Sequence, residues 1–324
     1  MKFHRSSLSR LLALVVTAAC LYFLASGNPR TPMGHPAQDS GRAASRSVSR
    51  ISFEIEGGHI FVPVRVNGSE PLWFGLDSGA EQTIISRQQA KALNLKLEGD
   101  MQAAGGGEGT VDFSITRKVA FGLPGVDFVL DEVGVLPLEF PAHVAGQAIA
   151  GLLGYDFIRR FVVEIDYTTR TINLYSPRTY RYSGRGAIIP IRMMDNNPYI
   201  PARVILPGLA PIGGMFLIDS GADTELFFNS PFVNKRRLLS SRQKTAEAST
   251  AGIGGASKIR IGMATSIQIG RAAIANPVAH FSQATKGESA GAIGAGFVGG
   301  KLLRRFQKVI FDQRRRRLIL EPDK

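Results

Sequence analysis

The feature that most constrains this chain is a five-residue pattern that occurs twice, at residues 76–80 and 218–222. In both copies an apolar run leads into Asp, Ser, Gly and Ala, and an acid follows, Glu81 in the first copy and Asp223 in the second. Apolar runs of this kind predict buried strands, and an unpaired charge is expensive to bury. Two such aspartates in one chain therefore suggest that each has the other as its neighbour.

The repeat extends well beyond this pattern. Each copy has a strand before it, a helix start and a glycine cluster after it, an apolar pair ending in glycine, and a closing hairpin around an Asp. The matching segments are residues 61–66 and 199–204, Ser86 and Ser230, residues 105–107 and 252–255, residues 151–154 and 291–294, and residues 163–174 and 309–320. Ser is a good helix N-cap. A repeat of this length predicts two lobes rather than a solenoid.

These motifs resemble those of the retropepsin-like aspartic protease family, in a fused two-lobe form of bacterial type. The resemblance rests on residues 77–81, 219–223, 152–154 and 292–294, and it covers residues 51–322. It implies an all-β fold of two pseudo-symmetric acid-protease lobes with one short helix each. We place the N-terminal lobe at residues 51–180 and the C-terminal lobe at residues 187–324.

The resemblance also implies an aspartic endopeptidase, a hydrolase whose water is activated between two carboxyl groups. Two carboxyl groups that share one site hold one proton between them at working pH. The implied catalytic residues are Asp77 and Asp219, supported by Ser78, Gly79, Ser220 and Gly221. Neither a metal nor an organic cofactor is expected, and the five histidines lack ligand spacing.

Two further sets of residues are implied to meet a peptide or protein substrate. Glu81 and Asp223 would face the substrate backbone or an arginine, although both also suit surface turns. The glycine clusters suit mobile hairpins that close over a peptide, or ordinary loops. Their residues are Gly105, Gly106 and Gly107 in the first copy, and Gly254 and Gly255 in the second.

An alternative is a catalytically inactive peptide-binding or scaffolding module of the same fold. Residues 154–157 (Gly-Tyr-Asp-Phe) resemble the family closely, whereas the second copy, residues 294–297, lacks the Asp. Both Asp-Ser-Gly patterns are present, and they favour the enzyme.

Two other motifs weakly suggest a different enzyme class. Residues 287–291 match the serine-hydrolase pattern G-x-S-x-G, which needs a later histidine, but the last histidine, His280, precedes Ser289. Residues 294–299 match G-x-G-x-x-G without the alternating strands and helices of a dinucleotide-binding fold.

The first 27 residues predict a signal peptide or a membrane anchor, since basic residues precede an apolar run from Leu11 to Ala25. Either form places the rest outside the cytoplasm, in the periplasm or tethered to a membrane facing it. Residues 28–50 are rich in Pro, Ser and Arg and predict a disordered linker. Cys20 is the only cysteine, so no disulfide within the chain is expected.

The formal net charge of +13 suggests contact with an anionic membrane surface, or serves solubility alone. Nucleic acid is not expected as a partner, because no aromatic residues interleave with the basic ones. Since both halves of the site lie in one chain, we expect a monomer that is an internal pseudo-dimer. The substrate, the cleavage preference and the pH optimum do not follow from the sequence.

Overall fold

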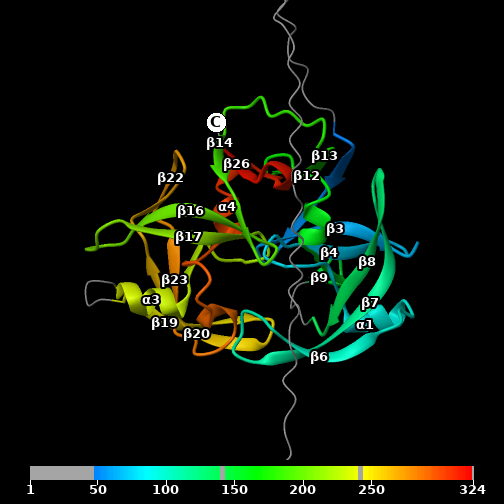
Figure 1. The fold of residues 1–324 in the computed structure, drawn as a ribbon, viewed down its shortest axis with the longest axis horizontal. Helices are drawn as coiled ribbons and strands as arrows, with labels where there is room; N and C mark the ends of the chain where they lie inside the picture. The colour runs from blue at the N-terminus through cyan, green and yellow to red at the C-terminus, as the bar shows by residue number, and fades with distance from the viewer. Residues whose placement is uncertain (1–46, 139–142, 240–243, 323–324) are drawn as a thin grey trace, which may run out of the picture. The chain divides into compact units, whose positions relative to one another are not determined.

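A computed structural model describes residues 47–138, 143–239 and 244–322, which belong to one compact unit, residues 43–324. Strands dominate it, as predicted, in three main sheets (Figure 1). The predicted leader, Cys20 and nearly all of the predicted linker lie outside the described residues. The domain boundaries at residues 180 and 187 stay predictions.

The first main sheet has eight strands, all from the first half of the chain, in the order β2-β3-β4-β11-β5-β8-β7-β6. Apolar side chains alternate along β3, where Ile60, Val62, Val64 and Val66 are all buried. The strands are β2 (Glu54–Glu56), β3 (His59–Val66), β4 (Leu72–Leu76), β5 (Ile84–Ser86), β6 (Glu98–Ala104), β7 (Thr110–Leu123), β8 (Val126–Leu136) and β11 (Gly151–Leu153). A separate pair consists of β9 (His143–Val144) and β10 (Gln147–Ala148).

The second main sheet has ten strands, all from the second half. Nine follow the order β19-β20-β23-β18-β24-β17-β16-β21-β22, and β15 pairs with β16. The strands are β15 (Arg192–Met194), β16 (Asn197–Ile205), β17 (Ile212–Asp219), β18 (Leu226–Phe228), β19 (Ala246–Gly252), β20 (Gly255–Met263), β21 (Ser266–Ile269), β22 (Ala272–Ala275), β23 (Val278–Ser282) and β24 (Gly296–Gly299).

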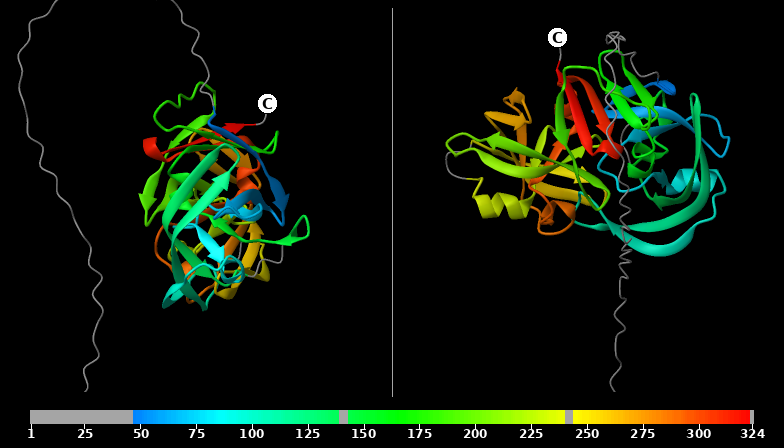
Figure 2. Two further views of the ribbon diagram at one scale, coloured as in Figure 1. Left: turned by 90° about the vertical axis from the view of Figure 1, so that its right-hand side faces the viewer. Right: turned by 45° about the horizontal axis from the view of Figure 1, so that its top comes forward.

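The third main sheet takes strands from both halves, in the order β1-β13-β12-β25-β26-β14. At its centre β12 pairs with β25, from Val162 opposite Asp312 to Asp166 opposite Lys308. The strands are β1 (Ser49–Ser52), β12 (Val162–Asp166), β13 (Thr171–Tyr175), β14 (Ala187–Pro190), β25 (Phe306–Asp312) and β26 (Arg317–Pro322). In Figure 2, right, β25 and β26 (red) lie between the two halves, so this sheet fastens them together.

One continuous core runs through both halves. It includes Phe74 and Leu76 from β4, Phe216 and Ile218 from β17, and Phe311 from β25, all at most 2% exposed. Because β4 and β17 lie inside this core, the residues that directly follow their apolar runs are held in fixed positions.

The expectation of one short helix in each half is wrong, because the described residues form two in each half. They are α1 (Arg87–Ala92), α2 (Tyr155–Ile158), α3 (Ser230–Arg236) and α4 (Gly300–Leu303), with single 3-10 turns η1 (Glu288–Ala290) and η2 (Gln313–Arg315). The helices α2 and α4 are single turns, too short to show a helical period of apolar residues. The start of α1 was predicted correctly, since the Ser86 hydroxyl accepts a hydrogen bond from the Gln89 N–H.

None of the helices in the described part of the chain is long and apolar enough to cross a membrane.

Candidate active site

The strands β4 and β17 bring the two Asp-Ser-Gly patterns together. Each pairs in parallel with the strand that precedes a short helix: Leu76 lies opposite Leu153 of β11, and Asp219 opposite Gly299 of β24. Each Asp thus stands where a core strand ends in a tight turn. The structure places the side chains of Asp77 and Asp219 within hydrogen-bond reach of each other.

The serines that follow the aspartates link the two halves. The Ser78 N–H donates to the Ser220 hydroxyl at 2.9 Å, and the Ser220 N–H donates to the Ser78 hydroxyl at 3.0 Å. Each hydroxyl also donates to the opposite strand, Ser78 to the Ile218 carbonyl at 2.6 Å and Ser220 to the Leu76 carbonyl at 2.9 Å. Four hydrogen bonds, buried from solvent, therefore fix the two Asp-bearing turns against each other.

The glycines leave room for the carboxyl groups. A Cβ on Gly79 would lie 2.8 Å from the Asp219 Oδ1, and one on Gly221 would lie 2.6 Å from the Asp77 Oδ1. Both distances are shorter than any normal contact, so a side chain at either position would displace a carboxyl group. The same glycines donate backbone N–H bonds within their own turns, Gly79 to Asp77 at 2.8 Å and Gly221 to Asp219 at 3.0 Å.

The two carboxyl groups differ in their electrostatics. Burial raises the pKa of Asp219 well above its ordinary value, and the charge of Asp77 raises it further. Burial also raises the pKa of Asp77, but hydrogen bonds from the Gly79 and Ala80 N–H groups stabilise its ionised form. The pair therefore holds a shared proton above the ordinary carboxyl range, with Asp219 as the better proton carrier.

The apolar pair ending in glycine was assigned wrongly in the second half. The pairing of β24 with β17 makes Gly299, not Gly294, the counterpart of Gly154: each stands at the N-cap of a single-turn helix, α4 or α2. Gly294 lies outside β24 and has a φ of +70°. The residues 292–294 and 297–299 both read apolar-apolar-glycine, and only the strand register distinguishes them.

With this register, Lys301 takes the place of Asp156. In the first half the Asp156 carboxylate accepts hydrogen bonds from the Thr83 N–H at 3.0 Å and from its hydroxyl. In the second half a buried carboxylate, Glu225, stands where β18 begins, and Arg305 donates to its Oε1 from two nitrogens at 2.9 and 2.5 Å. The two halves thus brace the Asp-bearing turns with different chemistry.

The acids that follow the patterns lie at the contact between the halves. The Asn197 side chain donates to Glu81 at 3.5 Å, and burial together with the charge of Asp195 raises the pKa of Glu81. Asp223 is exposed, and a Cβ on Gly58 would lie 3.1 Å from its Cβ. Among the described residues, neither acid forms an ion pair with an arginine.

The glycine clusters form the tips of two hairpins, β6–β7 and β19–β20, that meet each other (Figure 1). The Gly107 N–H donates to the Ile253 carbonyl at 2.9 Å, and the Gly109 N–H donates to the Gly254 carbonyl at 2.8 Å. A Cβ on Gly107 would lie 2.5 Å from the Gly255 nitrogen, so the backbones touch directly. Gly105 and Gly106 complete the first tip.

The turn η1 adds a residue that the sequence analysis missed. The Glu288 N–H donates to the Gly105 carbonyl at 3.0 Å, so this turn is bound to the first hairpin tip. Burial raises the pKa of Glu288 to about 7, with contributions from the charges of Glu81 and Asp77. Glu288 in turn raises the pKa of Asp219. In the sequence, Glu288 is an acid inside a glycine-rich turn, and it stood out only as part of the hydrolase-like pattern around Ser289. The Ser289 hydroxyl faces the Gly106 carbonyl.

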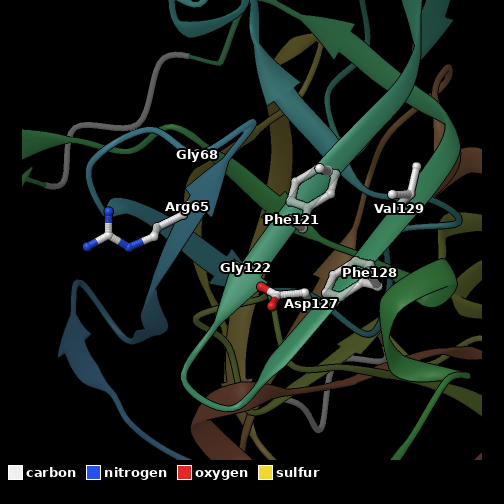
Figure 3. Close-up of a pocket in the computed structure, with 8 residues that line it drawn as sticks. Arg65, Gly68, Phe121, Gly122, Asp127, Phe128 and Val129 are labelled. Atoms are coloured by element: carbon white, nitrogen blue, oxygen red, sulfur yellow. The ribbon is translucent and has the colours of Figure 1, made fainter.

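A hollow of about 330 Å³ lies elsewhere, on the first half, between β3, β7 and β8 (Figure 3). Its apolar part is the stacked pair Phe121 and Phe128, whose ring centroids are 5.5 Å apart, and Arg65 points away from it. Neither Asp77 nor Asp219 lines it. The hollow therefore contributes nothing to the site.

Comparison with known proteins agrees with this geometry. Residues 62–157 match the family model described as "Aspartyl protease". This segment carries Asp77, its Ser-Gly-Ala turn, the strand β11 and Asp156. No curated protein matches the chain. This match supports a retropepsin-like aspartyl protease family for the segment of residues 62–157.

Proposed function

We propose that this protein is an aspartic endopeptidase in which Asp77 and Asp219 act together on one peptide bond. The observation that carries the proposal is the mutual contact of two carboxyl groups with raised pKa values at the junction of the two halves. A pair of carboxyl groups that shares one proton can act as base and acid in the same step.

In the proposed reaction the ionised carboxyl of the pair takes a proton from water. The water oxygen attacks the carbonyl carbon of the peptide, and the other carboxyl gives its proton to the carbonyl oxygen. The resulting gem-diol intermediate collapses: the C–N bond breaks, the leaving nitrogen takes a proton from the protonated carboxyl of the pair, and one hydroxyl of the intermediate returns its proton to the other carboxyl as the carboxylic acid product forms. Asp77, with two backbone N–H donors, suits the ionised role, and Asp219 suits the protonated one.

The arrangement of the hairpin tips suits a peptide substrate that lies extended between the carboxyl pair and the tips. Backbone N–H and carbonyl groups at Gly105, Gly107 and Gly254 already bond to neighbouring chain segments. Extended peptides are commonly bound through backbone hydrogen bonds to strand edges. Opening of the tips would admit the peptide, and closure would exclude water from the reaction.

The test uses Asp77→Asn and Asp219→Asn, with Asp131→Asn as a control on the exposed part of β8. A mixture of unstructured peptides serves as substrate, and mass spectrometry counts the cleaved bonds. We expect each site variant to lose activity by about 10²–10⁴-fold while its thermal unfolding stays cooperative. Full activity in either site variant would contradict the shared-pair mechanism.

A folded protein that cleaves nothing, but that binds peptides equally with or without the two aspartates, would instead indicate the non-catalytic binding module. In the corrected register the second half still lacks the acid found in the first, because Lys301 takes the place of Asp156, and the peptide-binding measurement therefore decides between the enzyme and this alternative.

A further inference from the structure

The six-stranded sheet turns one face away from the main core. The connection between β13 and β14 crosses this face, where Tyr180 packs against Val162, Ile310 and Ile319. Around this crossing lie exposed arginines of the connection, of β1 and of the turn η2. We call them the base face; they are Arg50, Arg178, Arg185, Arg314 and Arg316.

Hydrogen bonds hold these segments together. Arg315, in the middle of η2, donates to the Pro177 carbonyl at 3.1 Å and to the Tyr180 carbonyl at 3.2 Å, so Arg314 and Arg316 lie beside Arg178. The connection is fixed at its other end, where the Tyr182 hydroxyl donates to Glu321 at 2.8 Å. These contacts fix the backbone of the connection and of η2, the segments that carry four of the five base-face arginines.

Buried and exposed residues alternate along β1, and this alternation places Arg50 on the same outer face of the sheet. Its neighbours Ser49 and Ile51 are buried, and Arg50 is exposed. Arg50 lies opposite Asn173, whose side chain donates to Glu164 on the outer side of the sheet.

The acids near this face are already bound. Lys308 forms ion pairs with Glu164 at 3.3 Å and with Asp166 at 3.5 Å. Arg315 and Arg317 both pair with Asp312, which is fully buried. The ion pairs found within residues 47–138, 143–239 and 244–322 include none of the five base-face arginines, so their charge is directed to solvent.

Apolar side chains accompany the arginines. Ile188 of β14 is 53% exposed, and Val48, just before β1, is 47% exposed. The described part of the chain begins beside this face, at residue 47, and the Val48 N–H donates to the Leu174 carbonyl at 2.8 Å. The preceding sequence contains the apolar run of residues 11–25 and two more arginines, Arg42 and Arg46.

We propose that the base face docks on an anionic phospholipid bilayer. Guanidinium groups bind phosphate through paired N–H donors, and clusters of basic residues are attracted to anionic lipid surfaces. A flat bilayer matches arginines spread over several segments of one face, and exposed Ile188 can enter its interfacial layer. An apolar run in the same chain, joined at the same sheet, would keep the bilayer close to this face.

Docking in this way sets the direction in which the candidate site faces. In Figure 1 the strands β14 and β26 lie at the upper edge of the compact unit, and the hairpin strands β6, β19 and β20 lie at its lower edge. A bilayer on the base face would therefore leave the hairpin tips pointing into the surrounding solution.

The test compares two full-length variants that each lose four positive charges. The base variant is Arg178→Gln, Arg185→Gln, Arg314→Gln and Arg316→Gln. The control variant is Lys91→Gln, Lys118→Gln, Arg203→Gln and Lys235→Gln, all at exposed positions on other elements. Both variants keep the same N-terminal residues, so any contribution of those residues to binding is equal.

Binding is measured by co-sedimentation with vesicles of phosphatidylcholine alone and of phosphatidylcholine with 30% phosphatidylglycerol, a composition chosen for the test, at about 0.1 M salt. We expect the base variant to bind the anionic vesicles on the order of 100-fold more weakly than the control variant. On neutral vesicles the two variants should bind equally.

Equal losses in both variants would show that net charge, and not the base face, directs binding, and this would overturn the proposal. It would also be overturned if a soluble polyanion such as polyphosphate bound the unmodified protein tightly while anionic vesicles did not. Far-ultraviolet circular dichroism and thermal unfolding confirm that both variants fold, and neither measurement depends on peptidase activity.

Discussion

Ser78 and Ser220 exchange hydrogen bonds in both directions, since each backbone N–H donates to the hydroxyl of the other. Both residues are at most 2% exposed. A hydroxyl lost from either one leaves a buried N–H and a buried carbonyl without partners. This relationship makes the junction between the halves as sensitive as a core position.

We expect Ser78→Ala and Ser220→Ala each to lower the free energy of unfolding by about 1–3 kcal/mol. Ser→Thr at the same positions keeps the hydroxyl and should retain most of the stability. Urea unfolding measures both effects, and Ser183→Ala, at an exposed position, is the control. A stability unchanged by both alanine variants would show that the exchange does not hold the halves together.

A methyl group at Gly221 should remove activity without unfolding the protein. The Cβ of Gly221→Ala would lie 2.6 Å from both carboxyl oxygens of Asp77, and this contact forces the Asp77 carboxyl to move. We expect a loss in kcat/KM of about 100-fold or more, because misplacing a catalytic group by about 1 Å has effects of that size. Gly213→Ala, whose Cβ meets no atom within 4 Å, should behave like the unmodified protein.

The raised pKa of Asp219 means that this carboxyl group destabilises the folded protein at neutral pH. A carboxyl whose pKa is higher in the folded than in the unfolded state contributes stability below its unfolded pKa, near 3.8, and loses it as the pH rises through the folded pKa. Asp219→Asn removes this loss and keeps an oxygen acceptor for the Gly221 N–H. We therefore expect the variant to melt at a higher temperature than the unmodified protein at pH 7, and at a similar temperature at pH 3.

Differential scanning calorimetry across this pH range checks the prediction. A variant that is less stable than the unmodified protein at pH 7 would mean that Asp219 is ionised and stabilising in the folded state.

Glu288 should shift the pH dependence of activity. Its charge raises the pKa of Asp219, so in Glu288→Gln the shared proton should be lost at a lower pH. We expect the alkaline limb of the kcat/KM profile to move to lower pH, most clearly above about pH 7, where Glu288 itself is ionised. The exposed acid Glu70 provides the control variant Glu70→Gln, and identical profiles for the two variants would exclude this influence.

The hairpin tips should affect substrate binding more than chemistry. Gly107→Ala places a Cβ 2.5 Å from the Gly255 nitrogen, whereas Gly106→Ala places one 4.0 Å from the Gly252 Cα. We expect Gly107→Ala to raise KM about tenfold or more, and Gly106→Ala to raise it less, with thermal stability little changed in both. Equal KM values in the two variants would show that the tips need not meet for binding.

The sequence predicted the positions that depend on local chemistry. The apolar runs before Asp77 and Asp219 are strands, Ser86 caps a helix, and the glycine clusters are hairpin tips. Residues that reach the site through tertiary contacts were not predictable in this way. Glu288 is brought there by a hydrogen bond to Gly105, and Gly299 is identified only by its register opposite Asp219.

The buried ion pair of Glu225 with Arg305 was hidden for the same reason. The first half has a threonine hydroxyl and Asp156 in the corresponding place, so comparison of the two copies offered no acid–arginine pair to find. The two copies in this chain share the strand pattern but differ in the polar side chains that brace it.

The turn η1 bonds to the first hairpin tip, through Glu288 and Gly105, and within the described part of the chain it has no equal backbone bond to the second tip. A site built from two identical chains could accept a peptide in either orientation with equal energy. Here the two sides of the carboxyl pair are chemically distinct, so a bound peptide would have one preferred N-to-C polarity. Under the proposed function, these unequal halves would orient the substrate, and the residues that flank a cleaved bond would be selected independently on its two sides.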